Sequence, residues 1–209
     1  MPKRKPGFVA GERLVKAFAL TVELHAHQAR KQEGVPYISH LMDVSGLVMQ
    51  YGGSEDQAIA ALLHDGPEDQ GGRATLERIR NEFGEHVARI VQDCTDSFAG
   101  EPSPPWQERK QRHLDHFRLA PEQGGAVQEA CLVYAADKLS NARTMVDFQR
   151  RQGAAAWKHF ESRPVQMIWY LQSMAAAFRS RGVDAEMMDE LDREVQTLRQ
   201  LIAATSPGD

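Results

Sequence analysis

Along most of this chain the apolar residues recur every three or four positions, the spacing that places them on one face of a helix. The pattern predicts helices over residues 12–31, 40–51, 58–65, 76–83, 85–94, 109–119 and 128–145, and then over 154–160, 165–179 and 184–203. Ser39 and Thr75 are predicted N-caps, and Ser54 with Gln57 forms a capping box before the third helix. Residues 97–105, which contain a glycine and three prolines, are predicted to form a non-helical linker.

For three of these helices the apolar pattern also predicts how they are buried. Residues 58–63 and 131–136 are apolar on nearly every side, which predicts buried central helices. The last helix carries one apolar stripe, made of Met187, Leu191, Val195, Leu198 and Ile202. This stripe predicts packing against the protein's own core, with a dimer seam as the alternative.

Composition points to the same fold class. The strong helix formers Ala, Leu, Glu, Gln, Met, Lys and Arg total 107 of 209 residues, whereas Val, Ile and Thr total only 26. Buried parallel strands would require Val- and Ile-rich runs, which this chain lacks. We therefore predict an all-α protein.

Charge and cysteine content restrict the partners and the compartment. The net charge of −4 provides no general basic field, so neither nucleic acid nor a membrane is expected as a partner. Cys94 and Cys131 lack metal-type spacing and are predicted to be free core thiols in a reducing compartment. The basic N-terminus is not followed by an apolar signal region, and no run is long enough to span a membrane. We expect a soluble, cytoplasmic protein.

Ionisable residues inside the two most apolar helices point to a metal site. His64 and Asp65 end the first of them, and Asp137 interrupts the second. A buried carboxylate is costly unless it is paired or bound to a metal, and imidazole with carboxylate suits Mn²⁺, Fe²⁺ or Zn²⁺. His40 is a third candidate ligand, although a lone histidine there also fits a core or surface position.

Two further carboxylates follow directly. Glu68 and Asp69 lie four residues after His64 and Asp65, which places them on the same side if the helix continues. Pro67 favours a bend or an end of the helix there, so an acidic surface turn is the alternative.

Several separated motifs, in this order, resemble one known family. They are 25–31 (HAHQARK), 34–40 (GVPYISH), 61–65 (ALLHD) with Glu68-Asp69, Phe83-Gly84, 91–96 (VQDCTD), 137–141 (DKLSN) and Arg143-Thr144. The chain resembles the HD-domain metal-dependent phosphohydrolases, and within them the hydrolase domain of RelA/SpoT-type alarmone enzymes and the stand-alone small alarmone hydrolases. The resemblance extends from about residue 18 to residue 145.

The resemblance implies a role for each matching residue. The implied metal ligands are His40, His64, Asp65 and Asp137. Glu68 and Asp69 correspond to the pair that orients and deprotonates the attacking water. The implied substrate-binding residues are Arg30, Lys31, Asn141 and Thr144, and Arg143 is expected to pair with the acidic cluster.

The chain departs from the family pattern at three places. Gly66-Pro67 replaces an apolar pair, which could shift the geometry of the two carboxylates that follow. Ser140 stands where the long enzymes usually carry His, and Tyr134 where they usually carry Lys. Each of these could retune the substrate, and Tyr134 removes a positive charge near the phosphates.

Together these observations predict one HD phosphohydrolase domain over residues 1–209, with a core of about 8–150 and a helical extension over 151–209. The expected reaction is metal-dependent hydrolysis of the 3′-pyrophosphate of a guanosine or adenosine alarmone, with one divalent ion, Mn²⁺ before Fe²⁺ or Zn²⁺. A small nucleotide is the expected partner, and a homodimer is left open. Two alternatives remain: an enzyme for another nucleotide, such as a nucleoside monophosphate or NADPH, and a nucleotide-binding regulator that has lost its chemistry.

Overall fold

The computed structural model describes residues 8–30, 34–119, 126–159 and 162–205, and all regular secondary structure in these ranges is helical. The elements are α1 (Glu12–His25), α2 (Ile38–Gln50), α3 (Glu55–Leu63), α4 (Gly66–Asp69), α5 (Gly72–Phe83), α6 (Glu85–Cys94), α7 (Trp106–Leu119), α8 (Ala126–Gln152), the 3₁₀ helix η1 (Gly153–His159), α9 (Pro164–Ser180) and α10 (Ala185–Thr205). The prediction of an all-α fold is confirmed.

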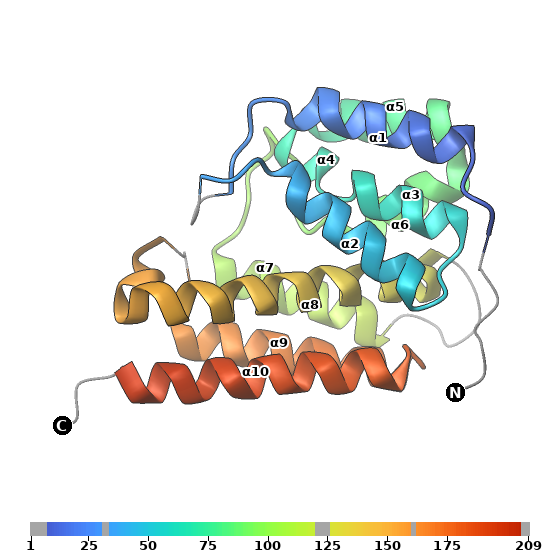
Figure 1. Ribbon diagram of the computed structural model, residues 1–209. Helices are drawn as coiled ribbons and strands as arrows, with labels where there is room; N and C mark the ends of the chain where they lie inside the picture. Colours follow the sequence, from blue (N-terminus) through green and yellow to red (C-terminus); the bar gives the residue numbers. More distant parts are fainter. Residues whose placement is uncertain (1–7, 31–33, 120–125, 160–161, 206–209) are drawn as a thin grey trace.

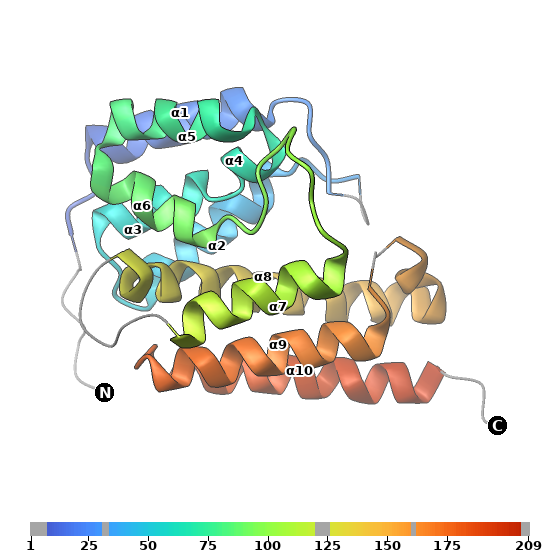
Figure 2. The ribbon, with the colours of Figure 1, turned by 180° about the vertical axis from the view of Figure 1, so that it is seen from behind.

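The helices lie in layers around α8 (Figure 1). On one side α8 packs against α2, α3 and α6, and on the other it packs against α9 and α10. α1 and α5 cover the first group, while α7 contacts α9 (Figure 2). α3 lies inside this arrangement because every residue from 58 to 63 is buried. The two helices that the sequence marks as central are therefore in contact at the centre of the molecule.

Several helix boundaries differ from the predicted ones. The capping box is confirmed, since Ser54 and Gln57 exchange hydrogen bonds at the start of α3. α1 ends at His25 rather than at residue 31, because the chain folds back and pairs Ala29 with Pro36. Ser39 and Thr75 are not N-caps, since α2 and α5 have already begun before them.

The linker over 97–105 crosses the molecule outside any helix, as predicted. The Ala99 amide donates to the Pro67 carbonyl at 3.0 Å, which fixes the linker against α4. The start of α5 approaches the same loop so closely that a Cβ on Gly72 would lie 2.5 Å from the Ala99 oxygen. Gly72 also has a φ of +60°, so both the loop and the backbone require glycine there.

The C-terminal stripe faces the interior. Met187, Leu191, Val195 and Leu198 are buried on α10, and Ile202 packs at the edge of the same core. The prediction of core packing is confirmed for this stripe. Cys94 and Cys131 are buried free thiols, also as predicted. Among the described helices, none is sufficiently long and apolar to cross a membrane.

Replacement of Leu191 by alanine tests how much α10 contributes to the core. Leu191 is fully buried, so Leu191→Ala should lower the free energy of unfolding by about 2–5 kcal/mol, as measured by urea denaturation. Leu119→Ala is the matched control, because Leu119 is 79% exposed and should change stability by less than about 0.5 kcal/mol. Equal effects of the two substitutions would contradict a structural role for α10.

Candidate active site

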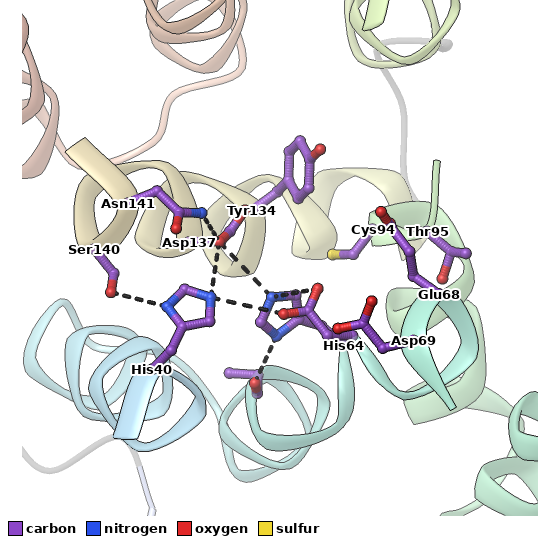
Figure 3. A network of polar contacts seen from close by, with 12 residues as sticks. His40, His64, Glu68, Asp69, Cys94, Thr95, Tyr134, Asp137, Ser140 and Asn141 are labelled. Atoms are coloured by element: carbon purple, nitrogen blue, oxygen red, sulfur yellow. Dashed lines mark hydrogen bonds and ion pairs between the residues drawn. The ribbon is translucent and has the colours of Figure 1, made fainter. Parts of the chain in front are cut away.

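The four implied metal ligands meet where α2, α3 and α8 come together (Figure 3). His40 lies in the first turn of α2, His64 directly follows α3, and Asp65 precedes α4. Ligand atoms of these three residues lie within 4.8 Å of one another. Asp137 of α8 completes the group, with its Oδ1 atom 3.1 Å from His40 Nε2 and 3.9 Å from His64 Nε2.

In both imidazoles the Nδ1 atom contacts an oxygen outside the group, and the Nε2 atom faces the group. His64 Nδ1 lies 2.8 Å from the Ala61 carbonyl oxygen, which can only accept a hydrogen bond. His40 Nδ1 lies 3.1 Å from the Ser140 hydroxyl. His64 Nε2 is buried without a hydrogen-bond partner among the described residues. A buried nitrogen of this kind, beside two carboxylates, is well placed to bind a metal ion.

Asp65 and Asp137 each accept a hydrogen bond from a residue that is not an implied metal ligand. The Tyr37 hydroxyl donates to Asp65 Oδ2 at 2.7 Å. The Lys138 ammonium donates to Asp137 Oδ2 at 2.6 Å, and it also lies 3.7 Å from the centre of the Tyr134 ring. Although burial raises the pKa of Asp137, the neighbouring Lys138 and the two histidines hold that pKa well below its usual value. Asp137 therefore stays ionised inside the core.

The charge of the group calls for a cation. Burial alone lowers the pKa of His64, but the carboxylates of Asp65 and Asp137 more than offset this and raise the pKa to about 9. A proton on His64 thus partly neutralises the two carboxylates. A divalent metal ion would displace that proton and bind the Nε2 lone pairs of both histidines. Two imidazoles and two carboxylates fit Mn²⁺, Fe²⁺ or Zn²⁺.

We call the four implied ligands His40, His64, Asp65 and Asp137 the metal group. Glu68 and Asp69 lie beside this group on the four-residue helix α4. Pro67 occupies the first turn of α4, where its missing N–H leaves no bond unmade. Both carboxylates line a pocket of about 340 Å³, and Asp69 Oδ2 accepts a hydrogen bond from Gln28. Gly66-Pro67 therefore starts a new helix that aims both carboxylates into the pocket.

The electrostatic surroundings of Glu68 are unusual. Burial, followed by the negative charge of Asp96, raises the pKa of Glu68 to about 8. Asp96 is itself paired with Arg109 and Lys110 of α7, and Arg109 Nη1 lies 3.8 Å from Glu68 Oε1. A carboxylate whose pKa lies near neutrality is suited to accept and release a proton at physiological pH.

The same pocket contains part of the implied substrate-binding set. Arg30 Nη2 donates to Asn141 Oδ1 at 3.2 Å, and both residues line the pocket. Within the described ranges, Arg30 Nε is buried without a hydrogen-bond partner, so a donor is available to an anion. Thr144 is one turn further along α8 and is not among the pocket-lining residues. Lys31 lies outside the described residues.

Sequence reasoning missed several residues of this site. Gln28, Tyr37 and Lys138 lie within the motifs over 25–31, 34–40 and 137–141, so membership of a motif was the available signal. No local pattern pointed to Arg109 and Lys110, because only the packing of α7 brings them to the site.

The structure contradicts the expectation for Arg143 and describes the surroundings of Tyr134. Arg143 pairs with Glu190 of α10 and not with the acidic cluster. Tyr134 is buried, with its hydroxyl 3.1 Å from that of Tyr170, and is not among the residues that line the pocket. The exchange of Lys for Tyr134 therefore changes the surroundings of Lys138 in the core.

Comparison with known proteins agrees with this geometry. The HD_4 family, described as HD domain, matches residues 17–162. The chain is similar to guanosine-3′,5′-bis(diphosphate) 3′-pyrophosphohydrolase MESH1 of Xenopus tropicalis, with 38% identity over 135 residues that cover 63% of this chain and 69% of that protein. MESH1 of Homo sapiens is 34% identical with the same coverage. A solved structure, described as a metazoan orthologue of SpoT that hydrolyses ppGpp, shares the fold with a TM-score of 0.71 at 23% identity, over 93% of this chain and 99% of that one.

The chain therefore belongs to the HD-domain family, whose hydrolases depend on a metal ion. Within that family its relatives include MESH1 pyrophosphohydrolases at 34–38% identity.

The raised pKa of Glu68 predicts a pH-dependent loss of stability in the metal-free protein. Between pH 4.5 and about 8 the folded protein retains a proton on Glu68 that the unfolded chain releases, so the contribution of Glu68 to stability falls as the pH rises through this window. Glu68→Gln stays neutral, so its stability advantage over the wild type should grow from pH 5 to pH 8. Urea denaturation in the presence of a chelator measures it, and a difference that is constant with pH would contradict the raised pKa.

Proposed function

We propose that this protein hydrolyses the 3′-pyrophosphate of a (p)ppGpp-type alarmone and releases pyrophosphate. One observation carries the proposal: the pocket beside the His and Asp group is lined by the carboxylates of Glu68 and Asp69 and by Arg30, whose buried Nε–H has no hydrogen-bond partner among the described residues. This arrangement suits a phosphorylated substrate that is attacked by water. Two relatives, at 38% and 34% identity, are named as enzymes for this reaction.

We propose His40, His64, Asp65 and Asp137 as the ligands of one divalent ion, with Mn²⁺ the first candidate and Fe²⁺ or Zn²⁺ the alternatives. When bound, such an ion lowers the pKa of a coordinated water towards neutrality and polarises a phosphoryl oxygen. The donor set of two imidazoles and two carboxylates supports this assignment.

The proposed roles of the remaining residues follow from their positions. Glu68, whose carboxylate lines the pocket, takes the proton from the attacking water. Asp69, fixed by Gln28, orients that water. Arg30 donates to a phosphate oxygen through its Nε–H, which is unpaired within the described part of the chain, while Asn141 fixes the guanidinium plane. Thr144 and Lys31 remain predicted contacts of the nucleotide.

The wider predictions are also part of this proposal. We propose one domain over 1–209, because α9 and α10 contribute buried residues to the same core cluster as α3 and α8. A small nucleotide is the proposed partner. The cytoplasmic location, the lack of a nucleic-acid partner and the open question of a homodimer stay predictions from the sequence.

A substrate screen tests the reaction directly. Protein supplemented with Mn²⁺ should release pyrophosphate from guanosine or adenosine 3′-pyrophosphates and should act weakly or not at all on nucleoside monophosphates and NADPH. Separate assays for pyrophosphate and phosphate distinguish the reactions. Release of phosphate alone, with no pyrophosphate from either alarmone, would contradict the proposal and favour another nucleotide as substrate.

Two substitutions separate metal binding from proton transfer. Asp137→Ala should abolish Mn²⁺ binding, because it removes a carboxylate that faces both histidines. Glu68→Ala should keep the metal but reduce kcat by about 10²–10⁴-fold, the usual contribution of a general base. Metal analysis and steady-state kinetics measure the two effects.

Asp43→Ala is the matched control for this pair, since Asp43 is exposed on α2 and should leave both properties unchanged. Near-normal turnover of Glu68→Ala would overturn its assignment as the base. A wild-type protein that is folded but binds no metal would favour the regulator that has lost its chemistry.

A further inference from the structure

The Nδ1 atoms of the two histidines in the metal group contact different kinds of hydrogen-bond partner. His64 faces the carbonyl oxygen of Ala61, which only accepts hydrogen bonds, so a neutral His64 carries its proton on Nδ1 and its lone pair on Nε2. His40 faces the hydroxyl of Ser140, which both donates and accepts. The backbone thus fixes the tautomer of His64, whereas the tautomer of His40 depends on a single side chain.

This side chain lies inside the protein. His40 and Ser140 are each only 3% exposed, and they meet where α2 packs on α8. His40 Nε2 points the other way, 3.1 Å from Asp137 Oδ1 and 3.7 Å from Asp65 Oδ2 (Figure 3). To bind a metal ion, Nε2 must present its lone pair, so the proton must lie on Nδ1 and requires an acceptor behind the ring.

We propose that Ser140 is a positioning residue whose hydroxyl accepts the Nδ1–H of His40 and so keeps the Nε2 lone pair directed at the metal site. This inference rests on the metal site proposed above. Ser140 is not among the residues that line the nucleotide pocket, so it acts through His40 and not on the substrate. The departure of Ser140 from the family pattern is then a change of partner for His40.

Metal affinity tests the role of Ser140 without reference to turnover. Isothermal titration of metal-stripped protein with Mn²⁺ should show about 10- to 100-fold weaker binding for Ser140→Ala than for the wild type, the usual effect of removing the outer partner of a histidine ligand. Ser140→Cys fills the same space but is a weak acceptor, and it should weaken binding similarly.

Ser45→Ala is the matched control. Ser45 is equally buried and donates to the Ala58 carbonyl at 2.9 Å, but that bond lies away from the metal group. The control should lose some stability and keep its Mn²⁺ affinity within about threefold of the wild type, a change well below the loss expected for an outer partner. Far-ultraviolet circular dichroism of each metal-free variant verifies the fold.

A spectroscopic measurement separates positioning from a general loss of packing. Long-range ¹H–¹⁵N spectra of the Zn²⁺-loaded wild type should show His40 protonated on Nδ1, and Ser140→Ala should lose this single state. Affinity of Ser140→Ala within threefold of the wild type, or full recovery in Ser140→Cys, would overturn this proposal alone. A wild-type protein that binds neither Mn²⁺ nor Zn²⁺ would overturn the metal site and this proposal with it.

Discussion

The buried carboxylate of Asp137 is the constraint around which the structure is organised. It lies in α8, the helix that packs against both layers, where an unpaired negative charge would be strongly destabilising. His40 from α2, His64 at the end of α3 and Lys138 on α8 surround it. The packing of α2 and α3 on α8 therefore satisfies the hydrophobic core and the charge of the site together.

The metal group depends on an outer ring of partners from distant parts of the chain. Tyr37 belongs to the segment before α2, Ala61 to the backbone of α3, and Ser140 and Lys138 to α8. Helix α9 takes part as well, because the centre of the Tyr170 ring lies 5.6 Å from the Lys138 ammonium nitrogen. Since each partner orients one ligand side chain, the geometry of the site is set by the whole fold.

Helical periodicity located nearly every element of the fold, but it failed at their ends. The predicted helix over 12–31 stops at His25, because Ala29 pairs with Pro36 and local spacing carries no information about such pairing. Thr75 resembles an N-cap, yet α5 starts at Gly72, where the linker passes too close for any side chain. These boundaries depend on contacts between segments that are separate in the sequence.

The sequence by itself determined the helical class, the two central helices, and the His and Asp residues proposed as metal ligands, because apolar runs interrupted by His and Asp are costly without a shared cation. Tertiary structure alone decided which atoms of these residues meet. It turned Arg143 towards Glu190, placed Tyr134 in the core, and brought Arg109 to Glu68. Periodicity specifies which face of a helix is buried, whereas the partner across that face depends on how the helices pack.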